Sequence, residues 1–305
     1  MKILFLGTPE FAAEHLKYLL EKKYNVVGVI SQPDKPRGRG KKLEPTPVKT
    51  IAQRFKIPVF QPKSLSKEGI KIIDETKPDI GIVVAYGKLL KQPFLDQIPF
   101  YNIHASLLPK YRGAAPIQRA LENGENKTGI TIFKIGEGMD NGPIALKKET
   151  KIGMYETYGE LYEKLIIIGK ELLIEFLEKY PLKLTPQDEH LATYAPKISK
   201  SDLKIDFHNS FEKVKNKIRA YDPFPGAQTF IHGKNVKVFH VFYHAPEKLQ
   251  FAPGKIINIS KEGATICCND GIIKVKYIQF PGKKKITFFE AKNGKLIKEG
   301  DIFES

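Results

Sequence analysis

The sequence predicts an α/β fold with a doubly wound, mostly parallel sheet, followed by a small β-barrel domain. The first half of the chain alternates apolar runs typical of strands with segments of helical apolar spacing, the pattern of parallel sheets with helical crossovers. The run at 79–87 is apolar almost throughout, which is typical of a strand buried on both faces of such a sheet. Beyond residue 207, short strand-like runs recur about every ten residues between Gly, Asn and Pro, as in small barrels.

The elements of the first region follow from their apolar patterns. Strands are expected at 2–7, 25–31, 57–60, 79–87, 101–106, 129–135 and 142–152, the last at a sheet edge. Helices are expected at 10–23, 47–55, 67–77, 117–124 and 156–180. Thr8 is expected to cap the first helix, with Pro9 at its first position. Residues 1–180 therefore form the first predicted domain.

The pattern changes after Tyr180. Residues 181–206 combine Pro, charge and little periodicity, and we interpret them as a linker that is free to wrap the first domain. A helix is expected at 210–221, and strands at 227–233, 235–244, 254–260, 263–271, 272–280 and 285–291. Residues 207–305 are therefore the predicted barrel domain.

Composition and charge narrow the class of protein. No apolar run approaches the ~20 residues that a membrane-spanning helix needs, so no membrane partner is expected. Cys267 and Cys268 are the only cysteines and are adjacent, which favours a reducing, cytoplasmic setting over a disulfide framework or a zinc site. The formal charge of +16 suits an acidic partner, most commonly a nucleic acid, although a generally basic, lysine-rich proteome is an alternative explanation.

Two polar residues lie at the end of a predicted strand. Asn102 and His104 are two positions apart in the run at 101–106, so both side chains point to one side of the strand. Ligands of doubly wound sheets bind beyond the carboxyl ends of the strands. A third candidate, Asp140, lies in the glycine-rich stretch "GEGMDNGPI" between two predicted strands, where the backbone can approach a ligand closely.

These three residue types suit the transfer of an acyl group between two nitrogens. An imidazole carries protons near neutral pH, an amide donates to an oxyanion, and a carboxylate orients the imidazole and favours its charged form. Each residue also has a structural explanation. A strand histidine is commonly a hydrogen-bonded core residue, and an Asp before Asn-Gly commonly forms a turn. His240 and His244 have the spacing of a metal pair, but we interpret them as strand residues and expect no metal.

The stretch "NIHASLLPKYRGAAPIQ", preceded by "AYG" and followed by "GEGMDNGP", resembles the formyltransferases that use 10-formyltetrahydrofolate. The resemblance implies a Rossmann-like formyltransferase domain that needs no metal. It implies that His104 carries the proton, Asn102 binds the formyl oxygen and Asp140 orients and charges the imidazole. The folate-binding residues that it implies are Ser106, Leu107, Leu108, Pro109, Tyr86, Gly87 and Gly138.

A narrower resemblance is to the branch of this family that formylates methionyl-initiator-tRNA. It rests on "FLGTPEFAAEHL", "SQPDKPRGRGKKLEPTPVK" and "RGAAPIQRAL", and more weakly on later stretches. It implies a basic loop that grips the acceptor end of the tRNA through Arg37, Arg39, Lys41 and Lys42. Residues 207–305 hold 17 Lys or Arg against 9 Asp or Glu, an excess that an oligonucleotide-binding (OB-like) barrel contacting phosphates would have.

The predicted function is therefore formyl transfer to methionyl-initiator-tRNA by a cytoplasmic, monomeric enzyme. One alternative is a formyltransferase for a small amine, such as a ribonucleotide or an amino sugar, which the basic loop and barrel disfavour. A second is a formyl-folate hydrolase, in which water replaces the amine. A third is a non-catalytic RNA-binding protein, which the complete set of Asn102, His104 and Asp140 disfavours.

Overall fold

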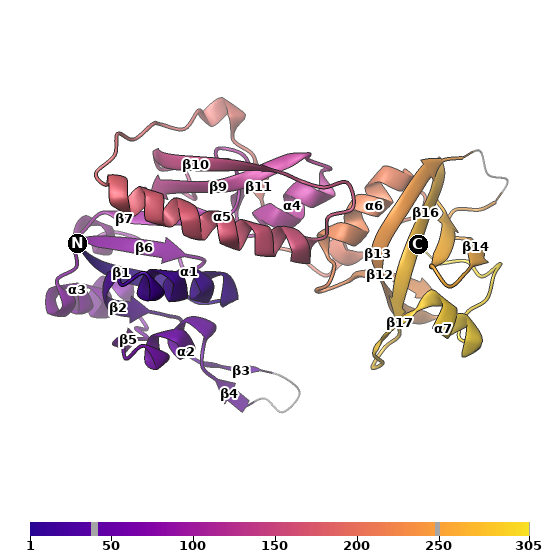
Figure 1. Ribbon diagram of the computed structural model, residues 1–305, viewed down its shortest axis with the longest axis horizontal. Coiled ribbons are helices and arrows are strands. Elements are labelled where there is room, and N and C mark those ends of the chain that lie inside the picture. The colour runs from indigo at the N-terminus through magenta and orange to yellow at the C-terminus, as the bar shows by residue number, and fades with distance from the viewer. Residues whose placement is uncertain (38–41, 248–250, 305) are drawn as a thin grey trace. The chain divides into compact units, whose positions relative to one another are not determined.

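The computed structural model describes residues 1–37, 42–247 and 251–304, and it divides into two compact units (Figure 1). Unit 1 comprises Met1–Gly113, Gly129–Thr150 and Lys164–Tyr194, and unit 2 comprises Ala114–Thr128, Lys151–Glu163 and Ala195–Ser305. Neither unit is continuous in the sequence, because the chain crosses between them several times. Most of the segment interpreted as a linker, up to Tyr194, belongs to unit 1.

A seven-stranded, mostly parallel sheet forms the centre of unit 1, as predicted. Its order is β10-β9-β7-β6-β1-β2-β5. The strands are β1 (Lys2–Gly7), β2 (Asn25–Ile30), β5 (Val59–Phe60), β6 (Ile80–Val84), β7 (Phe100–His104), β9 (Lys127–Lys134) and β10 (Ile144–Lys151). Neighbours from β5 to β7 are parallel, and β7 pairs antiparallel with β9. The strand order reverses between β1 and β6, so the carboxyl ends of these strands flank the crevice where such folds bind ligands.

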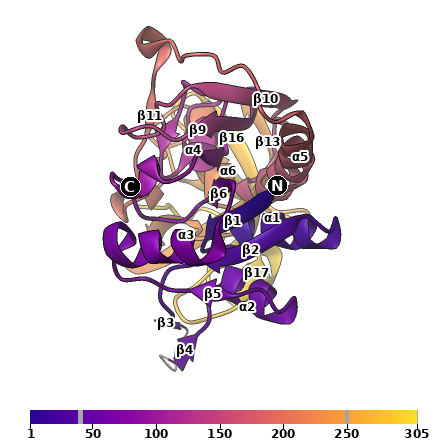
Figure 2. The same cartoon turned by 90° about the vertical axis from the view of Figure 1, so that its left-hand side faces the viewer.

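Helices cover both faces of this sheet. They are α1 (Glu10–Glu21), α2 (Pro47–Arg54), α3 (Ile70–Thr76) and α5 (Tyr158–Lys179). Figure 2 shows α3 on one face and α1 on the other, as right-handed crossovers on either side of β1 require. The predicted cap of α1 is wrong: the N-cap is Pro9, while the Thr8 hydroxyl donates to the Tyr86 carbonyl oxygen at 2.9 Å and links the loops after β1 and β6.

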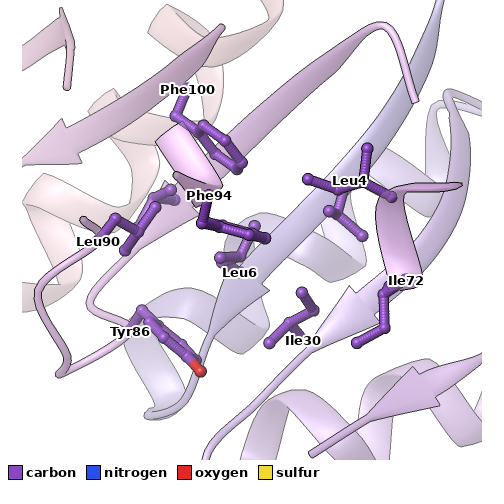
Figure 3. Packing of buried hydrophobic residues seen from close by; sticks show 10 residues of the cluster. Leu4, Leu6, Ile30, Ile72, Tyr86, Leu90, Phe94 and Phe100 are labelled. Atoms are coloured by element: carbon purple, nitrogen blue, oxygen red, sulfur yellow. The ribbon is translucent and has the colours of Figure 1, made fainter. Parts of the chain in front are cut away.

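A hydrophobic cluster fixes the positions of these strands (Figure 3). Its buried members are Leu4, Leu6, Ile30, Ile72, Ile73, Val83, Tyr86, Leu90, Phe94 and Phe100. The cluster joins β1, β2, β6 and β7 to α3, and each large apolar side chain buried contributes about 1.5–3 kcal/mol. Gly81 has no room for a side chain, because a Cβ there would lie 2.2 Å from the ring of Phe100. The amino end of β7 is therefore packed tightly against β6.

The polar segment after β2 contains a short hairpin of unit 1. Strands β3 (Lys35–Arg37) and β4 (Lys42–Glu44) pair antiparallel, with Pro36 opposite Leu43. Of the predicted basic loop, Arg37 is the last residue of β3 and Lys42 is the first residue of β4. Arg39 and Lys41 lie outside the described residues.

Unit 2 contains an antiparallel sheet with the order β12-β13-β16-β15-β14, and β17 pairs with β16. The strands are β12 (Ala227–Ile231), β13 (Lys234–Pro246), β14 (Ile256–Ile259), β15 (Ala264–Cys267), β16 (Gly271–Gln279) and β17 (Lys285–Thr287). The end of the chain bridges the two edges: Glu304 pairs with Phe230 on β12, and Ile302 pairs with Lys255 just before β14. These bridges close the sheet, which confirms the predicted small barrel.

Three further helices belong to unit 2, namely α4 (Pro116–Glu122), α6 (Phe211–Ala220) and α7 (Phe288–Asn293). The prediction of a strand over 285–291 is wrong in its second half, because α7 begins at Phe288. The Thr287 hydroxyl accepts from the Glu290 backbone N–H while the Glu290 carboxylate accepts from the Thr287 N–H, and this capping box starts a helix.

A separate two-stranded sheet pairs β8 (Arg112–Gly113) with β11 (Tyr194–Ala195). Across the described ranges, no helix is long and apolar enough to cross a membrane.

Candidate active site

The candidate site begins at the carboxyl end of β7, which holds Asn102 and His104. Asn102 lies beside Val83 of parallel β6, and His104 lies opposite Thr131 of β9. His104 is 6% exposed, whereas Asn102 is half-buried. The Asn102 side-chain amide has no hydrogen-bond partner among the described residues. It is therefore available to donate to a substrate.

The two ring nitrogens of His104 have different surroundings. Nε2 lies 2.8 Å from the carbonyl oxygen of Tyr111, and because a carbonyl only accepts, Nε2 carries a hydrogen. Nδ1 lies 3.6 Å from Oδ2 of Asp140. The neutral ring therefore has its lone pair on Nδ1, the nitrogen that faces the Asp140 carboxylate.

Asp140 is oriented by the backbone of the Arg-Gly pair in the same sequence motif. Its Oδ2 accepts from the Gly113 N–H at 2.8 Å, and this is the oxygen that faces His104. Glycine-rich turns surround it, and a Cβ on Gly142 would lie 1.8 Å from the Lys134 carbonyl oxygen. Only glycine at 142 lets this loop pack so closely on the end of β9.

Three non-glycine residues of the site have left-handed backbone: Ala85 with φ 45°, Tyr111 with φ 61° and Asp140 with φ 48°. This region is uncommon for alanine and tyrosine and more accessible to aspartate, and residues in it are enriched at functional sites. Tyr111 supplies the carbonyl that holds His104, and Asp140 supplies the carboxylate. Two of these three left-handed residues, Tyr111 and Asp140, therefore supply the groups next to the imidazole.

The residues Ser106, Leu107, Leu108 and Pro109 form the turn after β7. Ser106 is fully buried and donates to the Lys110 carbonyl oxygen at 2.6 Å. The Leu108 N–H donates to Oγ1 of Thr131 at 3.1 Å, and its side chain packs with Phe133 and Ile144. The side chains of Ser106 and Leu108 thus shape the turn, while Leu107 and Pro109 are half-buried.

Tyr86 and Gly87 follow β6, and Gly138 lies in the loop of Asp140. The Tyr86 ring is 1% exposed within the cluster of Figure 3, and burial raises its pKa to about 12. Gly87 is exposed, has φ +82°, and has open space where a Cβ would lie. Gly138 lies against Asn141. Of these, Gly87 offers the backbone that a ligand can approach.

Two residues of the segment 181–206, Gln187 and Glu189, were not predicted as part of the site, and both bind the side chain of Arg112. Arg112 is 2% exposed, and its guanidinium donates to both carboxylate oxygens of Glu189, at 2.8 and 2.7 Å, and to the side-chain oxygen of Gln187. The Glu189 carboxylate raises the pKa of Arg112. No periodicity or motif marks these positions, although a cluster of polar residues between Pro186 and Pro196 was a signal.

The remaining predicted residues lie in the hairpin and the barrel. Arg37 and Lys42 lie opposite each other in the β3–β4 hairpin, next to the undescribed Arg39 and Lys41. His244 lies on β13, where Nε2 is 2.7 Å from Oε1 of Glu212 and Nδ1 is 3.0 Å from the Tyr155 hydroxyl. Within 1–37, 42–247 and 251–304, no group of three or more His, Cys, Asp or Glu has the arrangement of a metal site.

The arrangement at β7 can move protons and stabilise an oxyanion. An imidazole with Nε2 held by a carbonyl oxygen faces a carboxylate through Nδ1, and an amide that has no partner among the described residues lies two residues before it on the same strand. These are the groups that acyl transfer to an amine requires. A sheet of this topology places them beside the crevice between β1 and β6.

Comparisons with known proteins agree with this chemistry. The family profile described as formyl transferase matches residues 1–177, and the profile described as formyl transferase, C-terminal domain, matches residues 197–296. Methionyl-tRNA formyltransferase of Thermosipho africanus is 65% identical over 305 residues, covering 100% of both chains. The same-named protein of Thermotoga maritima is 53% identical over 310 residues, covering 100% of this chain and 98% of its own.

Solved structures share the fold. The N-formyltransferase of Helicobacter canadensis, in complex with folinic acid and dTDP-3-aminofucose, has a TM-score of 0.68 at 21% identity, covering 91% of this chain and 100% of its own. HypX of Aquifex aeolicus, in complex with tetrahydrofolic acid, has a TM-score of 0.65 at 21% identity, covering 96% of this chain and 46% of its own.

Proposed function

This chain belongs to the formyltransferase family, among the methionyl-tRNA formyltransferases, and we propose that it transfers the formyl group of 10-formyltetrahydrofolate to the α-amino group of methionyl-initiator-tRNA. The product is N-formylmethionyl-tRNA, with which translation begins. The enzyme acts in the cytoplasm as a monomer, without a metal ion. Residues 1–180 carry the chemistry and residues 207–305 contact the tRNA.

The observation that carries this proposal is the pairing of His104 with Asp140 at the end of β7. The methionine amine attacks the formyl carbon, and the Asn102 amide donates to the oxygen as it gains negative charge. The proton that leaves the amine passes to Nδ1 of His104, and Asp140 balances the resulting charge. His104 then gives this proton to the folate nitrogen as the bond from that nitrogen to the formyl carbon breaks.

The folate is proposed to bind beyond β6 and β7, against the turn Ser106–Pro109, Tyr86, Gly87 and the loop of Gly138. Gly87 supports this position, because its exposed backbone can approach a flat ring closely. The hairpin loop with Arg37, Arg39, Lys41 and Lys42 is proposed to grip the acceptor end of the tRNA. Arginine holds a phosphate through two parallel hydrogen bonds, and lysine adds a point charge.

Lysines of the barrel support phosphate contacts by unit 2. Lys274 lies 4.9 Å from the ring centroid of Tyr243, and Lys276 and Lys285 lie 5.5 and 5.2 Å from that of Tyr277. Within the described part of the chain, none of these lysines lies within ion-pair distance of a carboxylate, although the charge of Lys285 acts on the Asp222 carboxyl, whereas Lys292 of the same unit pairs with Glu299. Lysines on a sheet that have no carboxylate in direct contact are suited to a nucleic-acid backbone.

The test is to supply 10-formyltetrahydrofolate labelled in the formyl group and to follow the label with different acceptors. We expect rapid labelling of methionyl-initiator-tRNA and much slower labelling of glycinamide ribonucleotide and of nucleotide-linked amino sugars. Preferred labelling of a small amine would support the small-amine alternative, and release of labelled formate without tRNA would support the hydrolase. Tight tRNA binding without any transfer would overturn the assignment as an enzyme.

A further inference from the structure

Gln187 connects the buried Arg112 to the loop that carries Asp140. Its amide nitrogen lies 2.9 Å from the Asp140 carbonyl oxygen and 2.7 Å from the Gly142 carbonyl oxygen. Its amide oxygen accepts from Nε of Arg112 at 3.2 Å and from Nη2 at 2.8 Å. One side chain therefore uses both of its donors on the loop and its acceptor on the arginine.

The orientation of this amide is fixed by charge. A guanidinium only donates, so the oxygen of Gln187 must face Arg112 and the NH₂ group must face the two carbonyls. Arg112 is itself fixed, because two hydrogen bonds join it to the carboxylate of Glu189 and its backbone N–H donates to the Thr193 carbonyl oxygen at 2.8 Å. The direction of the NH₂ group is thereby set before any substrate binds.

The backbone that Gln187 holds is the left-handed part of the loop. Asp140 has φ 48°, a conformation that aspartate adopts more readily than most non-glycine residues, and hydrogen bonds fix it on both sides. Its carboxylate accepts from the backbone N–H of Gly113, and its carbonyl oxygen accepts from Gln187. Loss of the Gln187 donors would leave the Asp140 and Gly142 carbonyl oxygens without these hydrogen bonds and would remove a restraint on the position of Oδ2 relative to Nδ1 of His104.

We propose that Gln187 is a positioning residue for catalysis, which acts by holding the backbone of Asp140 and Gly142 so that the Asp140 carboxylate faces His104. The kinetic consequence rests on the proposed formyl transfer. It concerns turnover rather than substrate binding, because an error of about 1 Å in a catalytic group costs up to ~10²-fold in rate.

Two substitutions separate the possible roles of this residue. Gln187→Glu keeps the side-chain length and an oxygen that accepts from Arg112. It replaces the NH₂ group by a second oxygen, which cannot donate to the carbonyl oxygens of Asp140 and Gly142. Gln187→Met has similar length and removes both functions. We expect both variants to lower kcat ~10- to 100-fold, with both KM values within about threefold of the parent. The matched control is Gln97→Ala, since Gln97 donates from its side chain to the Pro93 carbonyl oxygen elsewhere in unit 1.

A measurement that does not need the reaction accompanies the kinetics. In ¹⁵N-histidine spectra, assigned with a His104→Gln variant, the ring resonances of His104 should shift in both variants and remain in place in Gln97→Ala. Full activity in Gln187→Glu, or unshifted His104 resonances, would overturn the inference. If Gln187→Met does not fold, Gln187→Glu alone decides. A parent protein that transfers no formyl group would refute the proposed function, and the spectra would still decide the position of Asp140.

Discussion

Nδ1 of His104 lies 3.6 Å from Oδ2 of Asp140, while Nε2 of the same ring is held by the Tyr111 carbonyl oxygen at 2.8 Å. The longer distance exceeds that of a hydrogen bond, so the carboxylate does not share a proton with the neutral ring. It is near enough to stabilise the ring once Nδ1 is protonated. In the proposed mechanism Asp140 acts at the stage when His104 carries the proton.

Asn102→Ala should lower the turnover number by ~10²–10³-fold, the usual cost of removing one oxyanion donor. The Asn102 amide has no partner within the described part of the chain, so its loss leaves no buried group unpaired and should not disturb the fold. The measurement is kcat with saturating methionyl-tRNA, with the thermal midpoint as a control. A change confined to KM for folate would mean that Asn102 binds the donor instead.

Substitutions of His104 and Asp140 should not be additive. If the two residues act as one unit, His104→Ala combined with Asp140→Asn should cost far less than the product of the single losses. The parent, the two single variants and the double variant are compared by kcat/KM for methionyl-tRNA under one set of conditions. Losses that multiply would indicate that Asp140 has a role independent of the imidazole.

His15 should make the protein less stable in mild acid. It is fully buried on α1, and burial lowers its pKa to about 4, although its Nδ1 donates to the Phe11 carbonyl oxygen. Below the unfolded value of 6.5 the unfolded chain takes up a proton that the folded chain refuses, so the free energy of unfolding falls as pH drops from 6.5 to about 4. The decrease from this group is about 3 kcal/mol.

The matched variant for this prediction is His15→Asn, whose amide can keep the hydrogen bond to Phe11. Urea unfolding at pH 7 and pH 4 should show a smaller loss of stability in the variant than in the parent. Because other titrating groups are common to both proteins, their contributions cancel in the comparison. Equal losses in the two proteins would show that His15 is protonated in the folded state.

Lysines on β16 and β17 should contribute to the salt dependence of tRNA binding. Removing one lysine that binds a phosphate should reduce the slope of log affinity against log salt by about 0.9 on duplex RNA, taking the value for B-DNA, or less on single strands. We expect the double variant Lys276→Ala with Lys285→Ala to reduce this slope by nearly twice the amount expected for one lysine. Lys292→Ala, which removes a lysine already paired with Glu299, is the control. A double variant that follows the parent at every salt concentration would remove these lysines from the interface.

Most of the fold could be predicted because local sequence patterns indicate most of its helices and strands. Apolar runs indicated the strands of the two large sheets, and their alternation with helical spacing indicated the parallel sheet, whereas the short pairs β3–β4 and β8–β11 were not predicted. The start of α7 was missed because "KITFFEA" has β-branched and aromatic residues, and the capping box of Thr287 and Glu290 outweighs their preference. The closure of the barrel by Ile302 and Glu304 was not predictable either, because isolated bridges leave no periodic pattern.

The site was predictable only where its residues share a motif. Asn102, His104 and Asp140 were predicted because a family resemblance covers all three positions in order, and the structure places Oδ2 of Asp140 3.6 Å from Nδ1 of His104. Gln187 lies 75 residues from Arg112 and 47 residues from Asp140, and nothing in the sequence marks their contact. Interactions of this kind depend on the path of the chain after α5, which a segment rich in Pro and charge does not reveal.

The most direct test of the central claim is a single-turnover experiment with His104→Ala. Saturating enzyme, 10-formyltetrahydrofolate and methionyl-initiator-tRNA are mixed, and formyl transfer is followed by quenching. The parent should transfer rapidly, and His104→Ala should be slower by ~10²–10⁴-fold while binding the folate as tightly by calorimetry. The control is His208→Ala, since His208 is an exposed histidine of unit 2 whose loss should leave transfer unchanged. Transfer by a folded His104→Ala protein at the parent's rate would contradict the assignment of His104 as the proton carrier.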